Sequence, residues 1–126
     1  SMPIIFEMGD AFRSWCNPYG EENKEATFSL PLFHSAVIGY MQEARNFLTV
    51  EEWRALPGAT LTIAIELAAR FTADALMERH FSWDSERYRD ASEHNQVRAQ
   101  SQISLAHSIR EQWTTLEDVL RAAIDS

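Results

Sequence analysis

The sequence predicts an all-α protein, a bundle of about four to five helices that forms a single helical domain over residues 2–126. Apolar residues recur at alternating spacings of three and four in every long segment, which is typical of helices packed along one face. No segment alternates apolar and polar residues as a strand does, and no repeat or linker divides the chain. With 45% apolar and 11% aromatic residues, the chain can build a core.

The first helix is expected over residues 6–16 and ends before the turn-forming run Asn17-Pro18-Tyr19-Gly20. Residues 21–27 are polar and predict a surface loop. A second helix is expected over residues 29–48, with Ser29 as its N-cap. The apolar positions that define these two helices are Met8, Phe12, Trp15 and Cys16 in the first and Phe33, Val37, Tyr40, Ala44 and Leu48 in the second.

A short third segment begins with Thr49 and Glu52, the pair of a capping box, and Pro57-Gly58 is expected to end or kink it. Residues 59–80 are apolar almost all round, which predicts a central helix surrounded by other elements. Residues 82–90 predict a loop or a short helix. A single long helix is expected over residues 92–124, burying Ala99, Ile103, Ala106, Ile109, Trp113, Leu116, Leu120 and Ala123.

The net charge of −8 argues against nucleic acid as a partner, because phosphate binding needs a clustered basic surface. Cys16 is the single cysteine, so the sequence excludes an internal disulfide and a cysteine-based zinc site and fits a reducing, cytoplasmic environment. We expect neither an export signal nor a membrane span, since no run of about 18 apolar residues occurs.

The motifs of common catalytic and cofactor sites are missing from these residues. The four glycines have neither the dinucleotide-binding nor the P-loop spacing, and no Gly-x-Ser-x-Gly elbow is present. The histidines lack the i, i+4 spacing of a zinc-binding helix. We therefore expect no complete catalytic site, no metal site and no cofactor in this chain.

Charged residues on the predicted central helix are the most informative polar feature. Glu66, Arg70 and Asp74 follow one another at intervals of four, so that they share one stripe of the helix. Because a charge in a dry interior must be paired, this stripe forms an ion-pair ladder within the domain, lines a ligand site in a cleft, or lies at an interface. The ladder is the simpler interpretation.

Two further polar clusters have structural explanations. Asp10 and Arg13 stand at i, i+3, a spacing that allows an ion pair or a helix cap without any function. For His94-Asn95, followed by Arg98 and Gln102, we expect Ser92 or Asn95 to cap the last helix and the cluster to contact a neighbouring helix.

Taken in order, these clusters resemble the C-terminal helical region of the aminoglycoside phosphotransferase and choline kinase-like family, closest to its N-acetylhexosamine kinases. The resemblance rests on three ordered motifs and covers nearly the whole chain. They are Met-Gly-Asp-Ala-Phe-Arg-Ser-Trp-Cys-Asn at 8–17, Ile-Glu-Leu-Ala-Ala-Arg-Phe-Thr-Ala-Asp-Ala-Leu at 65–76 and Glu-His-Asn-Gln-Val-Arg-Ala-Gln-Ser-Gln at 93–102.

The resemblance implies that the chain starts after the catalytic machinery of such a kinase. It contains no His-x-Asp-x-x-x-x-Asn loop, no Asp-Leu-Asp metal motif and no ATP-lobe lysine. ATP and magnesium are therefore expected only for a full-length relative. Departures from the family pattern are Glu7, where an aspartate is usual, and His80-Phe81, where the hexosamine kinases have Tyr-Phe.

What the resemblance implies for this chain is the acceptor side of the pocket. Arg70 corresponds to the arginine that contacts the sugar, His80 replaces the aromatic hydroxyl, and Glu66 and Asp74 hold the guanidinium in place. We therefore expect substrate-binding roles for Arg70, His80, Glu66 and Asp74, with a sugar or aminoglycoside-like ligand.

Three hypotheses follow. The chain is the acceptor-side helical subdomain of a small-molecule kinase, inactive alone. Alternatively, it is a non-catalytic interaction module whose exposed apolar surface pairs with a second copy or with a missing kinase lobe. The third possibility is a small-ligand binder that retains the pocket around Arg70.

Overall fold

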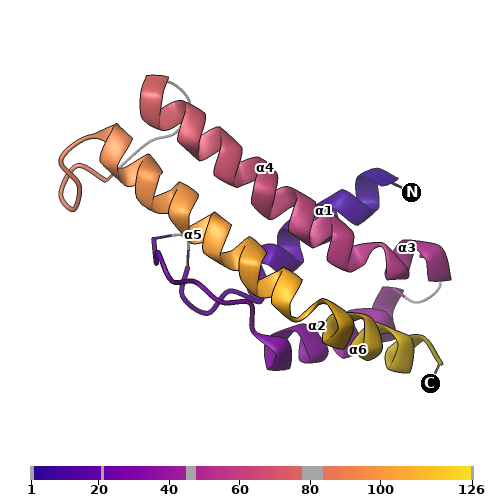
Figure 1. The fold of residues 1–126 in the computed structure, drawn as a ribbon. Helices are drawn as coiled ribbons and strands as arrows, with labels where there is room; N and C mark the ends of the chain where they lie inside the picture. The colour runs from indigo at the N-terminus through magenta and orange to yellow at the C-terminus, as the bar shows by residue number, and fades with distance from the viewer. Residues whose placement is uncertain (1, 21, 45–47, 78–83, 126) are drawn as a thin grey trace.

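The computed structural model describes residues 2–20, 22–44, 48–77 and 84–125, and this part of the chain is entirely helical apart from its connecting loops (Figure 1). The all-α prediction is confirmed: the described residues form six helices, where four to five were expected. None of these helices is long and apolar enough to cross a membrane. They are α1 (Met2–Trp15), α2 (Leu30–Ala44), α3 (Val50–Arg54), α4 (Leu56–Met77), α5 (Ala91–Glu111) and α6 (Trp113–Asp125).

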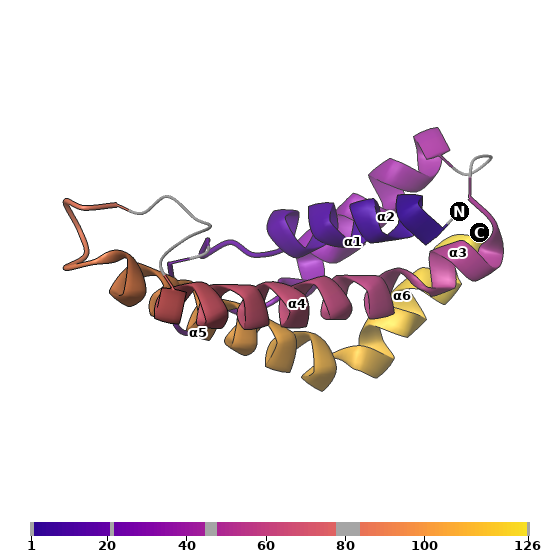
Figure 2. The ribbon, with the colours of Figure 1, turned by 90° about the horizontal axis from the view of Figure 1, so that it is seen from above.

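The helices form two layers. The long helices α4 and α5 lie side by side and antiparallel, and α6 continues from the end of α5 (Figure 1). Figure 2 shows α1 and α2 together on one face of this layer, with the opposite face of α4 and α5 left uncovered. The far ends of α4 and α5, with the 84–90 segment that precedes α5, project beyond α1 and α2.

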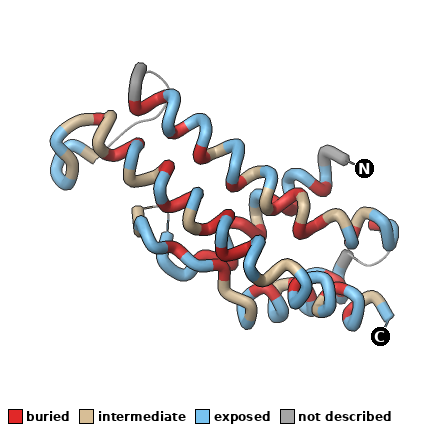
Figure 3. Tube along the Cα trace, viewed as in Figure 1, coloured by how far each residue is buried: buried red, intermediate tan, exposed pale blue. Residues whose placement is uncertain are grey.

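The apolar core lies where α1, α2, α3 and α6 meet the first turns of α4 and the last turns of α5. The buried positions line the facing sides of the helices, whereas the outward sides are exposed (Figure 3). Burial of these apolar side chains is the main contribution to the stability of the fold, at about 25 cal/mol per Å² of apolar surface removed from water. The largest fully buried apolar side chains are Phe12, Phe33, Ile5, Leu56, Leu105, Ile109, Leu116, Leu120 and Val37.

A glycine allows α1 and α4 to cross closely. A Cβ atom built on Gly9 would lie 2.8 Å from the carbonyl carbon of Ala59 and 2.9 Å from its Cβ. No real side chain is accommodated at such distances without a backbone shift. Gly9 is therefore required where it stands, although glycine costs about 1 kcal/mol relative to alanine inside a helix.

The short helix α3 begins with the capping box that the sequence predicted. The Thr49 hydroxyl accepts the backbone N–H of Glu52 at 3.1 Å, and the Glu52 carboxylate accepts the backbone N–H of Thr49 at 3.0 Å. Pro57 and Gly58 do not end a segment but lie in the first turn of α4, where a proline is tolerated because its missing N–H would have no helical partner.

The helix predicted over residues 59–80 is confirmed as far as Met77, but the expectation that other elements surround it was wrong. α4 packs against α1 and α5, but one side faces solvent, and Ile65 is 53% exposed there. A helix with alanine on several faces has too little apolar bulk for its periodicity to show which side is open. Residues 78–80, the expected end of this helix, lie outside the described residues.

The single long helix predicted over residues 92–124 is broken at Gln112. There the backbone leaves the helical region, with φ −99° and ψ 10°, and α6 sets off in a new direction (Figure 2). The Gln112 side chain donates to the carbonyl oxygen of Phe28 at 2.7 Å. This contact between residues 84 positions apart cannot be inferred from the spacing of apolar residues, which continues through the break.

The expected apolar stripe of α5 was also wrong at Ile103, which is 39% exposed. In its place, a polar stripe of α5 faces the loop that connects α1 to α2, and serine hydroxyls supply hydrogen bonds to the backbone of that loop. The contacts are Ser101 Oγ to the Gly20 carbonyl at 3.2 Å, Ser104 Oγ to the Lys24 carbonyl, and the Phe28 N–H to Ser108 Oγ at 2.8 Å.

Candidate functional site

The three charges of the α4 stripe lie in two different environments. Glu66 and Arg70 are exposed, and their side chains form an ion pair at 3.6 Å. Asp74 is completely buried. Four residues turn an α-helix by about 400°, so a side chain four positions further along is displaced by about 40° around the helix axis. Over the eight residues from Glu66 to Asp74 the displacement doubles, and the Asp74 side chain faces α5.

Asp74 belongs to a buried polar contact between α4 and α5. Its Oδ2 accepts a hydrogen bond from the Asn95 side chain at 2.9 Å, and Asn95 Oδ1 in turn accepts from Arg98 at 3.0 Å. The Arg98 guanidinium also lies over the ring of Phe71, 5.6 Å from its centroid. Asp74 thus joins α4 to α5 through Asn95, and its expected role in substrate binding stays a prediction.

Glu66 and Arg70 open onto a groove of about 310 Å³ between α1 and α4. The α4 side of this groove also includes the apolar side chains of Ile63 and Leu67, and the α1 side supplies Phe6, Glu7 and Asp10. The groove therefore combines apolar surface with one guanidinium and three carboxylates. Such a mixture provides hydrogen-bond donors and acceptors for a small polar ligand, with an excess of negative charge.

Asp10 is held in place from behind. Its Oδ1 accepts from both Nε and Nη2 of Arg13, at 3.0 and 2.9 Å. Arg13 is buried, and its Nη1 donates to the Oε1 of buried Gln102 at 3.2 Å. The sequence predicts the i, i+3 pair of Asp10 and Arg13, but not the hydrogen bond from Arg13 to Gln102 of α5 or the position of Asp10 at the groove. No periodicity connects residues that lie 89 positions apart.

His80, the fourth predicted site residue, lies outside the described residues, as does Phe81. Its expected role in substrate binding therefore stays a prediction. Within the described residues, no three His, Cys, Asp or Glu side chains are grouped closely enough to hold a metal ion.

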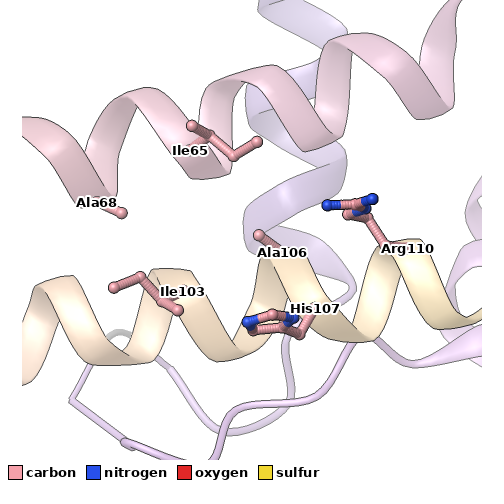
Figure 4. Close-up of a pocket in the computed structure, with 6 residues that line it drawn as sticks. All are labelled: Ile65, Ala68, Ile103, Ala106, His107 and Arg110. Atoms are coloured by element: carbon pink, nitrogen blue, oxygen red, sulfur yellow. The ribbon is translucent and has the colours of Figure 1, made fainter.

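A second depression lies on the uncovered side of α4 and α5. It measures about 200 Å³ and is lined by Ile65, Ala68, Ile103, Ala106, His107 and Arg110. Figure 4 shows the isoleucines on opposite walls, with Arg110 extending from α5 toward α4 at one end. This surface is mainly apolar, unlike the groove between α1 and α4.

No protein-family model matches this chain.

Proposed function

We propose that this chain is the acceptor-side helical subdomain of a small-molecule kinase of the aminoglycoside phosphotransferase type, acting on a sugar or a related polyhydroxylated compound. The groove between α1 and α4 binds the acceptor, and a separate lobe supplies ATP, magnesium and the catalytic loop. These 126 residues alone do not transfer phosphate, because phosphoryl transfer depends on bound metal ions and a positioned base.

The observation that carries this proposal is the placement of Arg70. Its side chain is 62% exposed at the edge of the groove, and the Glu66 carboxylate holds the guanidinium at 3.6 Å. A guanidinium offers several donors in a fixed plane, and the carboxylates of Glu7 and Asp10 on the α1 side offer acceptors. Donors and acceptors on opposite walls suit the vicinal hydroxyl and amide groups of a hexosamine.

Ligand titrations of the purified chain test this function. Millimolar N-acetylglucosamine, N-acetylgalactosamine and kanamycin are added separately, and amide chemical shifts and the thermal midpoint are recorded. We expect one of them to shift residues of the groove, and Arg70→Ala to weaken that binding by about tenfold or more. Arg121→Ala is the matched control, since Arg121 is 65% exposed and paired with Asp118 on α6.

Two results would contradict the proposal. One is the absence of any shift at the groove with all three compounds. The other is phosphorylation of a sugar or aminoglycoside by the purified chain with ATP and magnesium, which would require a catalytic site that the proposal denies.

A second candidate function is a non-catalytic interaction module, favoured by the apolar depression between α4 and α5 (Figure 4). Ile65 and Ile103 are 53% and 39% exposed there, and exposed apolar surface of this kind is often covered by a partner. Sedimentation velocity at low micromolar concentration tests self-association, with Ile65→Asp as the disrupting variant and the exposed Thr62→Asp as its control. A monomeric wild-type chain would count against this candidate.

A further inference from the structure

One buried histidine joins three segments at the projecting end of the molecule. His94 lies in the first turns of α5 and is only 2% exposed. Its Nδ1 lies 3.0 Å from the backbone nitrogen of Asp84, and its Nε2 lies 3.3 Å from Oε1 of Glu22 in the loop between α1 and α2. The Tyr88 ring stacks on the imidazole, with the centroids 4.1 Å apart and the planes inclined by 12°.

These contacts fix the tautomer of the ring. A backbone amide can only donate, so the Nδ1 atom that faces Asp84 must carry a lone pair. The neutral imidazole then has its hydrogen on Nε2, where it donates to the Glu22 carboxylate. Both ring nitrogens are thus satisfied in the neutral ring, and a single side chain ties the 84–90 segment and the α1–α2 loop to α5.

Protonation affects the two contacts differently. The imidazolium carries a hydrogen on each nitrogen, so Nδ1 stops accepting and faces the Asp84 N–H as a second donor. The Nε2 contact to Glu22 is preserved and becomes an ion pair. Proton uptake therefore removes the bond to the 84–90 segment and strengthens the bond to the α1–α2 loop.

The charged groups around His94 allow the ring to lose its bond to Asp84 and gain an ion pair with Glu22 while the protein stays folded. Glu22 faces Nε2 directly, and on α5 the Glu93 carboxylate and the N-cap Asp90 are paired with Arg89. In the 84–90 segment, the Asp84 carboxylate accepts the Glu86 N–H and Arg87 lies over the Tyr88 ring. On the α4 side, Asp74 is bound to Asn95, the next residue along α5. Of these groups, Glu22 is the one in contact with the imidazole, and it compensates the charge.

We propose that His94 is a pH-dependent latch: the neutral ring holds the Asp84 end of the 84–90 segment against α5, and protonation releases it while the α1–α2 loop stays attached. The 84–90 segment leads into the first turn of α5, away from the apolar core, so its release alters the projecting end and leaves the core unchanged.

Nuclear magnetic resonance of the intact chain between pH 8 and pH 5 tests this latch. At pH 8 the ¹⁵N shifts of the His94 ring should identify a protonated Nε2 and an unprotonated Nδ1. As the ring titrates, the Asp84 amide proton should move upfield, and its protection from exchange, corrected for the intrinsic pH dependence, should fall by about tenfold. His94→Gln should abolish the pH response of Asp84, and His34→Gln, at an exposed position of α2, should preserve it.

Three results would overturn the proposal. These are an Nδ1–H tautomer at pH 8, an Asp84 amide that does not follow the His94 titration, and a response that persists in His94→Gln. If His94→Gln fails to fold, the ring tautomer and the Asp84 titration of the wild-type chain still decide the question, because neither needs a variant.

Discussion

At the scale of single residues, this domain depends on groups whose roles are set by what lies against them. Arg13 and Asp10 have the i, i+3 spacing of an ordinary helical ion pair. In the structure, however, Gln102 of α5 accepts a hydrogen bond from the buried Arg13, which in turn orients the Asp10 carboxylate at the groove. Glu66 and Asp74 are chemically alike, but one is solvated and one is buried. Burial and partners, which the residue type does not specify, decide which carboxylate can meet a ligand.

The crossing at Gly9 predicts opposite outcomes for two glycine-to-alanine changes. Gly9→Ala should lower the free energy of unfolding by about 1 to 3 kcal/mol, since the new methyl group meets the Ala59 backbone at 2.8 Å. Gly39→Ala in α2 meets nothing within 4 Å and should raise it by about 0.5 to 1 kcal/mol through helix propensity. Urea denaturation measures both. A neutral or stabilising Gly9→Ala would contradict the close crossing.

Cys16 provides a prediction about pH. Burial raises the pKa of its thiol from 9.0 to about 12, because the interior disfavours the thiolate. The unfolded chain therefore loses this proton first, so the associated stability is present below about pH 9 and is lost as the pH rises toward 12. Wild type should lose more stability than Cys16→Ala between pH 8 and pH 10.

Alkylation gives an independent measurement of the same burial. Iodoacetamide at pH 8 should label the native chain at least about a hundredfold more slowly than the urea-unfolded chain, since the thiolate is the reactive form. Rapid labelling of the native protein would mean that Cys16 is accessible.

At the scale of helices, α5 shows how a polar face can be a packing face. Ser101, Ser104 and Ser108 form hydrogen bonds with the backbone of the α1–α2 loop, whose N–H and C=O groups need partners. α5 therefore buries two faces: an apolar one with Leu105 and Ile109 in the core, and a polar one with these serines against the loop. Ile103 lies on neither face and is 39% exposed.

Two serine-to-alanine variants test this arrangement. Ser108→Ala removes the acceptor of the buried Phe28 N–H and should destabilise the domain by about 1 to 3 kcal/mol. Ser104→Ala removes a bond to the Lys24 carbonyl at an exposed position, where water replaces the hydroxyl, and should cost less than about 0.5 kcal/mol. Thermal denaturation compares the two variants. If both variants lost the same stability, burial of the Phe28 amide would not explain the contribution of its hydrogen bond.

At the scale of the whole molecule, the domain has an apolar end and a polar end. Leu105 and Ile109 in the last turns of α5 lie in the main core, whereas the first turns pack through the Asp74–Asn95 contact and the His94 cluster. Among the described residues, the contacts that join the helices at this end are mainly polar, so local opening should begin there.

Native-state hydrogen exchange should reveal this division. Amides of residues 105–109 should exchange at least about tenfold more slowly than those of residues 94–98, because the former open only with the core. Uniform protection along α5 would instead show that the domain opens as one cooperative unit.

The all-α class, the approximate positions of the helices and the capping box at Thr49 can be predicted from the sequence, because they depend on periodicity and on contacts within four residues. The sequence also singled out Arg70 and Glu66, which the structure places at an open groove. Only the tertiary structure decided that Asp74 is buried, that Gln102 supports Arg13, and that the last helix breaks at Gln112. Each of these depends on contacts between residues more than 20 positions apart, which the periodicity of a single segment does not encode.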